Sequence, residues 1–173
     1  MRSFEKNLDK IFVPPKSFNC LMNCTYKKIS IILVFSFYYF YFKPTEAHNC
    51  FLLAAQYQHV NPQILQAIAW RESHINSRAI HRNSNGTTDY GLMQINSIHL
   101  KKLAKYRISK NRLMEPCANV FIAAWHLRQQ MNQYGNTWQA VGAYHSKTPA
   151  LRDRYAKSII RIINMQHFTL LNK

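Results

Sequence analysis

Acidic residues are scarce in this sequence of 173 residues: seven Asp and Glu stand against 23 Lys and Arg, a formal net charge of +16. A chain this basic is attracted to polyanions, whether nucleic acid, acidic lipid or a cell-wall polymer. The sequence has no zinc-finger spacing and no aromatic sheet signature of nucleic-acid-binding proteins, so we expect no nucleic-acid partner. The positive net charge alone does not distinguish an acidic lipid from a cell-wall polymer as the partner.

The sequence also lacks internal repeats, low-complexity tracts and long linkers, which predicts one compact, monomeric unit. A His-Glu-x-x-His motif is missing, and neither Cys50 nor Cys117 belongs to a cluster of metal ligands. We therefore expect no metal and no cofactor. The apolar content of 47% is sufficient for a hydrophobic core.

One long apolar run is present, "ISIILVFSFYYFYF" at residues 29–42. Lys27 and Lys28 precede it, and Thr45 and Ala47 supply small residues after it. The run is short for a bilayer span, whereas a basic flank, an apolar segment and a small-residue site are typical of a secretory signal peptide. We predict cleavage after Ala47 and export to the periplasm, and an uncleaved membrane anchor is the alternative.

A signal peptide begins at its initiating methionine, yet this apolar run begins only at residue 29. Initiation at Met22 would give a signal of ordinary length. The chain is therefore predicted to have three parts. Residues 1–21 are an artefact of start-site choice or a disordered extension, residues 22–47 are the signal peptide, and residues 48–173 are the exported domain.

The four cysteines fit export. Cys20 and Cys24 lie in the segment before the predicted cleavage, so the exported domain keeps Cys50 and Cys117. An even pair of cysteines in an oxidising compartment indicates a disulfide. Two buried free thiols are the alternative.

Helix-start signals recur along the exported domain. A capping residue followed by proline occurs at Asn61-Pro62, Glu115-Pro116 and Thr148-Pro149. With the apolar periodicity, they predict a mainly helical fold whose helices span residues 50–60, 62–73, 117–134 and 150–166, with shorter helices at 97–106 and 138–144. Asn85-Gly86 predicts the turn of a β-hairpin within residues 82–95.

A carboxylate stands at an apolar position of the second helix. Leu65, Ile68, Ala69 and Glu72 follow the i, i+3, i+4, i+7 spacing of one buried stripe. Burial disfavours the charged form of a carboxyl group and raises its pKa, which is the state that a general acid requires near neutral pH. A structural ion pair with Arg71, or a helix end that emerges into solvent, explains the position as well.

Three segments follow one another along the chain: Glu72-Ser73 at the end of the second helix, "GLMQI" at residues 91–95 and "AVGAYHS" at 140–146. Together they resemble the soluble lytic transglycosylase family. Within it, the chain is similar to the small exported enzymes that accompany type III and type IV secretion systems and conjugative transfer, the invasion-protein type. The resemblance covers roughly residues 50–163 and implies a single goose-type lysozyme-like domain, mainly α, with a short β-hairpin region.

That family cleaves the β-1,4 bond between N-acetylmuramic acid (MurNAc) and N-acetylglucosamine (GlcNAc) of peptidoglycan without adding water. The resemblance implies that Glu72 first protonates the leaving oxygen and then accepts the proton of the muramyl 6-hydroxyl as an anhydro ring closes. An ordinary glycosidase needs two carboxyl groups. Here Glu115 is interpreted as a helix cap, and Asp153 as a first-turn acid facing the helix dipole. Asp89 remains a candidate second acid, although an Asp in a turn most often bonds its own backbone.

The resemblance also implies substrate-binding roles. Met93 lines the sugar groove, Gln94 reads an acetamido group, and the Tyr144 hydroxyl approaches the catalytic carboxyl. Ser73 helps to position the substrate, and His145 stands as a polar contact where many members have Asn. From the residues alone, Met93 is equally a core side chain, Gln94 a loop amide and His145 a solvated imidazole.

Two further features are expected to be structural. Gly91 permits a close backbone approach that a side chain would block. Trp70, Trp125 and Trp138 could stack on sugar rings, but each fits a helix stripe, so we expect them in the core.

The leading interpretation is a peptidoglycan lytic transglycosylase that locally opens the wall for a secretion or conjugation apparatus, whose components are its other expected partners. A hydrolytic lysozyme-like muramidase on the same fold is the second, and only the first leaves anhydro-muramyl ends. An inactive wall-binding assembly scaffold with a basic surface is the third. Replacement of Glu72 by Gln is expected to abolish wall lysis while leaving wall binding and folding near normal.

Overall fold

The computed structural model describes residues 46–171 of the chain. Backbone contacts separate Met1–Glu46 from Ala47–Lys173, so the described residues belong almost entirely to the second unit. The predicted extension and the apolar run of the predicted signal peptide lie outside them, and both stay predictions. Within residues 46–171, no helix is both long enough and apolar enough to cross a membrane.

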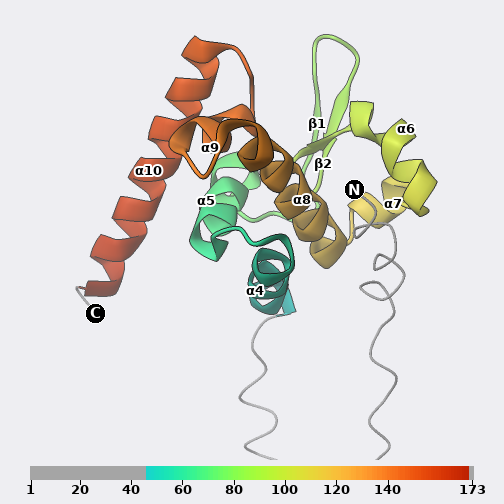
Figure 1. The fold of residues 1–173 in the computed structure, drawn as a ribbon. Coiled ribbons are helices and arrows are strands. Elements are labelled where there is room, and N and C mark those ends of the chain that lie inside the picture. The colour runs from blue at the N-terminus through green and yellow to red at the C-terminus, as the bar shows by residue number, and fades with distance from the viewer. Residues whose placement is uncertain (1–45, 172–173) are drawn as a thin grey trace, which may run out of the picture. The chain divides into compact units, whose positions relative to one another are not determined.

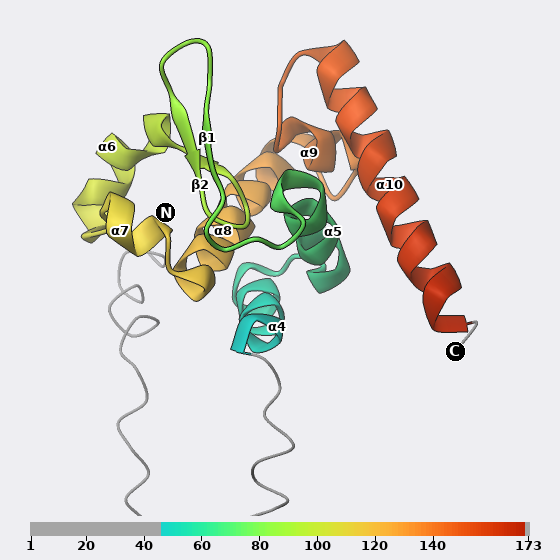
Figure 2. The same ribbon diagram turned by 180° about the vertical axis from the view of Figure 1, so that it is seen from behind.

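The main helices of the described part are arranged as Figures 1 and 2 show. They are α4 (Glu46–Gln58), α5 (Pro62–Ser73), α8 (Pro116–Tyr134), α9 (Trp138–Ala143) and α10 (Pro149–Leu171). The three predicted proline starts are confirmed, since α5, α8 and α10 each begin at a proline. The Asn61 side chain caps α5 by accepting a hydrogen bond from the Gln63 backbone N–H at 2.8 Å.

The core lies between these helices. Helices α5 and α9 each pack against both α8 and α10, and α8 runs through the middle in both views (Figures 1 and 2). The side chains of Leu65, Ile68, Leu127 and Ile159, from α5, α8 and α10, are 0% exposed. Burial of each such side chain contributes about 1.5–3 kcal/mol, which fixes α5 and therefore its carboxyl end.

The short helices differ from the prediction. Residues 97–106 do not form one helix but three pieces, the 3-10 turns η1 (Ser97–His99) and η2 (Ala104–Tyr106) on either side of α6 (Leu100–Leu103). A further helix, α7 (Lys110–Leu113), was not predicted. Its cap is Ser109, whose hydroxyl accepts from the Arg112 backbone N–H at 3.3 Å.

A small antiparallel sheet confirms the predicted hairpin and extends it. Its strands are β1 (Ile80–Arg82), β2 (Thr88–Tyr90) and β3 (Ile95–Asn96), in that order. Gly86 has a φ of 81° in the turn between β1 and β2, as the Asn-Gly signal requires. The third strand was missed because two residues are too few to show an alternating pattern.

Asn119 of α8 ties the sheet to the helices. Its side chain is 0% exposed; Oδ1 accepts from the Met93 N–H at 2.7 Å, and Nδ2 donates to the carbonyls of Tyr90 and Leu113 at 2.9 and 2.8 Å. The turn between β2 and β3 lies so close that a Cβ on Gly91 would stand 2.6 Å from Asn119 Nδ2. The expected close approach at Gly91 is therefore present, with this buried amide on the other side.

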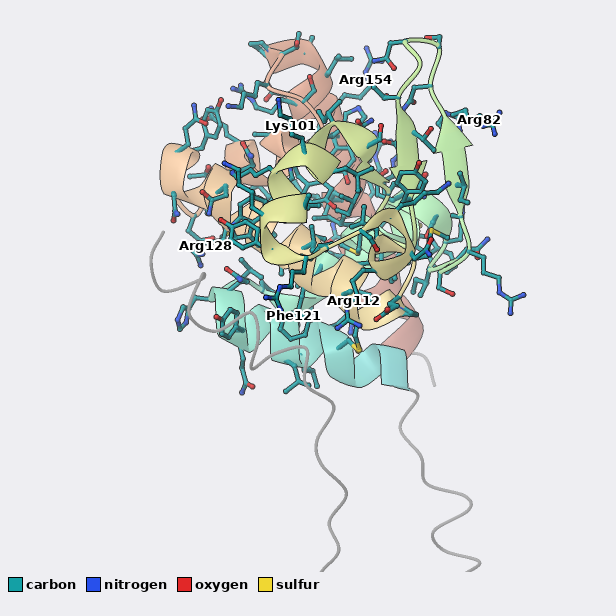
Figure 3. The ribbon with its side chains drawn as sticks, turned by 90° about the vertical axis from the view of Figure 1, so that its right-hand side faces the viewer. Arg82, Lys101, Arg112, Phe121, Arg128 and Arg154 are labelled. Atoms are coloured by element: carbon teal, nitrogen blue, oxygen red, sulfur yellow. A yellow bond between two sulfur atoms is a disulfide. The ribbon has the colours of Figure 1, made fainter. Side chains whose placement is uncertain are left out.

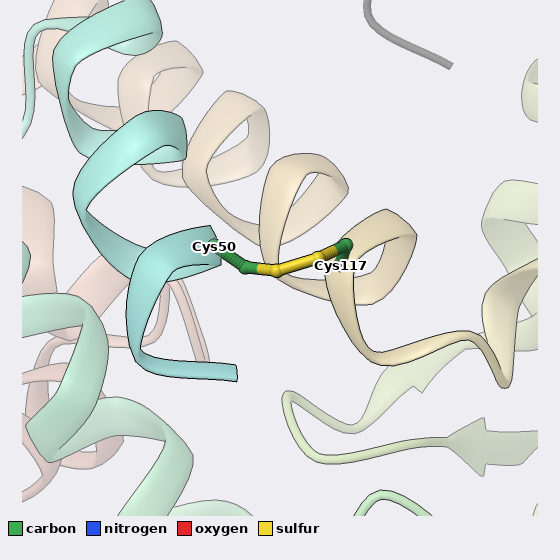
Figure 4. Close-up of a disulfide and its surroundings, with 2 residues drawn as sticks. All are labelled: Cys50 and Cys117. Atoms are coloured by element: carbon green, nitrogen blue, oxygen red, sulfur yellow. A yellow bond between two sulfur atoms is a disulfide. The ribbon is translucent and has the colours of Figure 1, made fainter. Parts of the chain in front are cut away.

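A disulfide joins Cys50 of α4 to Cys117 of α8, with the two Cα atoms 5.2 Å apart (Figure 4). The predicted pairing is confirmed. The two cysteines are 67 residues apart in sequence and lie near the starts of their helices, so the bond closes a large loop that contains α5 and the sheet.

The tryptophan prediction is wrong for two of the three residues. Trp125 is 9% exposed, but Trp70 and Trp138 are 43% and 45% exposed. Trp70 falls between the positions of the buried stripe on α5, and its ring packs edge to face with the His74 ring, with 5.1 Å between the ring centroids. Trp138 is the first residue of α9, where no preceding turn covers the ring.

Basic side chains extend from many elements of the fold. Figure 3 labels Arg82 of β1, Lys101 of α6, Arg112 of α7, Arg128 of α8 and Arg154 of α10. Residues 48–173 contain 16 Lys and Arg but four Asp and Glu, a balance of 16 − 4 = +12. Most of this positive charge therefore has no acid with which to pair.

Candidate active site

A pocket of about 580 Å³ opens where the end of α5, the sheet, α8 and the segment after α9 meet. Four of the predicted site residues line it: Glu72, Gln94, Tyr144 and His145. These residues come from positions 72 to 145 of the sequence, and the packing of α5, α8 and α9 brings them together. Ser73 and Met93 are not part of the lining.

Glu72 stands at the carboxyl end of α5, partly buried, on the stripe that begins with the fully buried Leu65 and Ile68. Burial raises the pKa of Glu72 above its usual value of 4.5. The charges of His145 and Arg71 act against this increase, and the charge of Asp89 adds to it. The predicted increase in the pKa of Glu72 is therefore present, and its cause is the burial of the carboxyl group in the fold.

The hydroxyl that contacts Glu72 belongs to Tyr155 of α10, which donates to Oε1 at 2.5 Å. This hydrogen bond is the largest influence that lowers the pKa of Glu72. Tyr155 is 4% exposed, and burial raises its own pKa well above 10.0, so it stays a neutral donor. The sequence prediction missed this residue, although Tyr155, Ile159 and Ile162 form the buried stripe of α10.

Tyr144 was expected to bring its hydroxyl to the Glu72 carboxyl group, and this expectation is wrong. Its ring lines the pocket, but its hydroxyl donates to the Met93 carbonyl at 3.0 Å. Met93 itself is 0% exposed, so its side chain is a core residue and not a groove residue. Tyr144 and the turn that carries Met93 thus hold each other in place.

Ser73 is also structural in this arrangement. Its hydroxyl donates to the Leu92 carbonyl at 2.8 Å and accepts from the Asn76 N–H at 3.0 Å. Helix α5 ends here, because His74 adopts the left-handed conformation with a φ of 54°. Ser73 therefore fixes the end of α5 against the turn between β2 and β3, and it does not reach the pocket.

Gln94 and His145 do reach the pocket. The Gln94 amide nitrogen donates to the carbonyls of Gly91 and Ala79, at 2.7 and 3.3 Å. Its amide oxygen is the group that remains for a substrate N–H. His145 is exposed, and its ring stacks on Tyr155 at 4.9 Å with an interplanar angle of 3°.

Asp89 shares the pocket with Glu72. The expectation of a turn residue bonded to its own backbone is wrong, because Asp89 lies in strand β2. Its Oδ1 accepts from Asn96 Nδ2 at 2.6 Å, and its Oδ2 accepts from Asn83 Nδ2 at 2.9 Å. Both oxygens are thus oriented by side-chain amides.

The other two acids of the exported domain are on the surface. Glu115 occupies the cap position of α8, but its carboxylate makes no capping bond and pairs with Arg112 at 2.6 Å. Asp153 lies beyond the first turn of α10 and pairs with Arg152 at 2.8 Å. Neither residue lines the pocket, so Glu72 and Asp89 are its acids within residues 50–165.

A neutral histidine, His126 of α8, also lines the pocket. Burial lowers the pKa of His126 to about 4, so the ring is uncharged at neutral pH, and Nε2 lies 3.2 Å from the Tyr144 carbonyl. The ring also packs on Tyr144 and on His99, at 5.1 and 5.2 Å. In the part of the chain that the structure describes, no three His, Cys, Asp or Glu side chains are grouped to hold a metal ion.

Comparison with known proteins finds a matching family and several relatives. Residues 49–160 match the Transglycosylase SLT domain. The chain is 43% identical over 116 residues to "Invasion protein IagB" of Salmonella typhimurium (strain LT2), which covers 64% of this chain and 72% of the relative. It is 38% identical over 118 residues to "Protein IpgF" of Shigella flexneri, covering 65% of this chain and 78% of the relative. It is 37% identical over 123 residues to "X polypeptide" of Escherichia coli (strain K12), covering 67% and 73%.

The domain implies peptidoglycan as the substrate and a lytic-transglycosylase-like function. The mainly helical fold with its small antiparallel sheet is the lysozyme-like fold that the sequence predicted. This chain therefore belongs to the Transglycosylase SLT domain family, in the group that includes the invasion-associated proteins.

Proposed function

We propose that this protein cleaves the MurNAc–GlcNAc β-1,4 bond of peptidoglycan without water and releases 1,6-anhydro-muramyl products. The proposal rests on the carboxyl group of Glu72, which lines the pocket. This group is partly desolvated and accepts a hydrogen bond from a buried tyrosine hydroxyl. A raised pKa suits a general acid near neutral pH.

The geometry supports a two-step use of this one residue. Glu72 Oε1 accepts from Tyr155, so the proton of the neutral carboxyl group sits on Oε2 and is the one passed to the glycosidic oxygen. The bond to the leaving GlcNAc breaks, and Glu72 becomes a carboxylate that Tyr155 stabilises. The carboxylate then takes the proton of the muramyl 6-hydroxyl while that oxygen bonds to C1, which restores neutral Glu72.

Mass analysis of muropeptides released by residues 48–173 tests this reaction. Each cleavage is expected to leave a muramyl end that lacks one water relative to the hydrolysis product. Glu72→Gln keeps the size of the side chain and removes its proton transfer, so release is expected to fall by at least about a hundredfold. Equal release by this variant and the parent, with both folded, would show that Glu72 is not the acid.

A hydrolytic muramidase is the second candidate, and the position of Asp89 favours it. Two carboxyl groups in one pocket are what an ordinary glycosidase requires, and Asp89 lines the same pocket as Glu72. Products with free reducing ends, lost in Asp89→Asn, would support hydrolysis. Anhydro ends that persist in Asp89→Asn would support the transglycosylase.

We further propose export and a role beside a secretion or conjugation apparatus. The apolar run at residues 29–42 supports a signal peptide cleaved after Ala47, with an uncleaved anchor as the alternative. A relative named as an invasion protein supports service to a secretion system. Amino-terminal sequencing of the periplasmic protein tests the cleavage, and restoration of secretion in a deletion strain by the parent but not by Glu72→Gln tests the role.

A further inference from the structure

The imidazole ring of His145 lies on the residue that bonds the candidate acid. It stacks on the Tyr155 ring, with 4.9 Å between the ring centroids and an interplanar angle of 3°. His145 is exposed whereas Tyr155 is 4% exposed, so the imidazole covers part of the buried phenol ring. Tyr155 in turn donates its hydroxyl hydrogen to Glu72 Oε1 at 2.5 Å. His145 is therefore connected to the carboxyl group of Glu72 through Tyr155.

The backbone determines where the His145 ring lies. His145 follows α9, and its N–H donates to the Gly142 carbonyl at 3.1 Å. At Gly142, helix α9 approaches α10 so closely that a Cβ would collide with the Arg152 carbonyl. The two helices lie side by side in both views (Figures 1 and 2). Because Tyr155 is one turn further along α10 than Arg152, the same close contact places the His145 ring on Tyr155.

Several charged groups surround Glu72. Burial raises the pKa of Glu72, and among the neighbouring charges that of His145 lowers this pKa most. Arg71 on α5 lowers it less, and Asp89 on β2 raises it. His126 of α8 is neutral at neutral pH, because burial lowers its pKa to about 4. The other titratable residues that line the pocket are His99, Tyr144 and Lys147.

A positive charge on His145 makes it easier for Glu72 to lose its proton. The charge favours the carboxylate over the neutral acid. Glu72 therefore gives its proton to the glycosidic oxygen more readily, and the carboxylate formed in the first step is stabilised. Histidine is the side chain whose charge ordinarily changes between about pH 5 and pH 8. An uncharged His145 keeps the stacked ring and loses the electrostatic effect.

We infer that His145 is a positioning residue for the acid: its ring holds Tyr155 against Glu72, and its positive charge eases the release of the Glu72 proton in mildly acidic solution. This role differs from the polar substrate contact that the sequence predicted for His145. The inference rests on the proposed function, because it concerns the proton that Glu72 gives to the glycan. Neither effect requires His145 to touch the sugar, so kcat is expected to depend on His145 while KM stays near the parental value.

The test replaces His145 by Phe, which keeps a flat ring on Tyr155 and removes the charge, and by Ala, which removes both. The rate of muramyl-end release from uncrosslinked glycan strands is measured from about pH 4 to pH 9. In His145→Phe the alkaline limb of kcat/KM is expected to move to higher pH, because the pKa of Glu72 rises when the neighbouring charge is lost. At the acid end, kcat is expected to fall about threefold in His145→Phe and about tenfold in His145→Ala.

Lys147→Gln is the matched control for the loss of a positive charge. Lys147 lines the same pocket, but the charges that influence the pKa of Glu72 belong to other residues. This variant is expected to keep the alkaline limb at the parental position. A second readout needs no substrate: in NMR, the Glu72 carboxyl carbon is expected to titrate at higher pH in His145→Phe than in the parent or in Lys147→Gln. Thermal unfolding confirms that each variant is folded.

The outcomes separate this inference from the proposed function. A parental titration of Glu72 in His145→Phe would overturn the inference, and so would equal shifts in His145→Phe and Lys147→Gln, which would assign the effect to the overall charge of the pocket. A raised KM with a parental kcat would make His145 a substrate contact and also overturn it. The proposed function fails separately, if the parent protein releases no anhydro-muramyl ends. The NMR titration then still decides whether His145 controls the proton of Glu72.

Discussion

The hydrogen bond from Tyr155 to Glu72 leads to a specific prediction about the pKa of Glu72. The bond joins a neutral donor to Oε1 at 2.5 Å. A hydrogen bond to a charged acceptor is worth about 1.5–3 kcal/mol, against about 0.5–1.5 kcal/mol for a neutral one. Tyr155 therefore favours the carboxylate of Glu72 over the neutral acid by about 1 kcal/mol. Loss of the hydroxyl raises the pKa of Glu72 further and lowers its acid dissociation constant roughly five- to tenfold.

The variant Tyr155→Phe tests this reasoning through the pH dependence of kcat/KM. The alkaline limb of the profile reports the acid that must be protonated in the free enzyme. Because the pKa of Glu72 rises in the variant, that limb is expected to move to higher pH. The rate on the plateau is expected to fall about tenfold, because the carboxylate formed in the first step loses its donor.

Tyr144→Phe is the matched control. It removes a hydroxyl from the same pocket, but that hydroxyl donates to the Met93 carbonyl and not to Glu72. Its alkaline limb is expected to stay at the parental position, whatever happens to the plateau. The reasoning is refuted if Tyr155→Phe keeps the parental limb, or if both tyrosine variants shift it equally.

Four further predictions concern stability and binding. The folded state binds the Glu72 proton more tightly than the unfolded state, so the free energy of unfolding falls as pH rises from about 4.5 through the raised pKa. Glu72→Gln cannot lose this proton, so its Tm is expected to exceed that of the parent at pH 8. The difference in Tm is expected to disappear at pH 4. Gly91→Ala places a Cβ 2.6 Å from Asn119 Nδ2 at a φ of 73°, and a loss of about 1–3 kcal/mol is expected in urea unfolding. Replacement of Cys50 and Cys117 by Ser opens a loop of 67 residues and is expected to cost about 4 kcal/mol, measured in the same way. Binding of residues 48–173 to purified sacculi is expected to weaken strongly between about 0.05 and 0.5 M NaCl, because +12 acts through screened charges; attachment that ignores salt would contradict this.

The parts of the fold that could be predicted are those with a local physical signal. Proline is favoured at the first position of a helix because its fixed φ suits the helix and its missing N–H is not needed there, and Pro62, Pro116 and Pro149 each begin a helix. The buried stripe of α5 that includes Glu72 could be predicted from the spacing of apolar residues alone, because a helix repeats every 3.6 residues. The disulfide between Cys50 and Cys117 was predicted because an exported domain with two cysteines is expected to oxidise them.

The parts that could not be predicted depend on contacts between distant segments. Tyr144 and Tyr155 are both tyrosines near the pocket, and only the packing of α10 on α5 decides which hydroxyl meets Glu72. Asn119 looks like a polar helix residue in sequence, yet it is fully buried because backbone groups of β2, of the turn after β2 and of α7 bond to it. Met93 sits in the core for the same reason, since its backbone is held on both sides by Asn119 and Tyr144.

At two glycines the backbone of one element comes very close to a neighbouring helix. At Gly91 the sheet approaches Asn119 of α8, and at Gly142 helix α9 approaches α10 so closely that a Cβ would collide with the Arg152 carbonyl. The first contact places the strands that carry Asp89, and the second helps to bring α10 near enough for Tyr155 to reach Glu72. A larger residue at position 142 would therefore push α10 outward and weaken the Tyr155 bond without touching the acid. The protonation of Glu72 is in this sense a property of helix packing, and residues with no chemistry of their own control it.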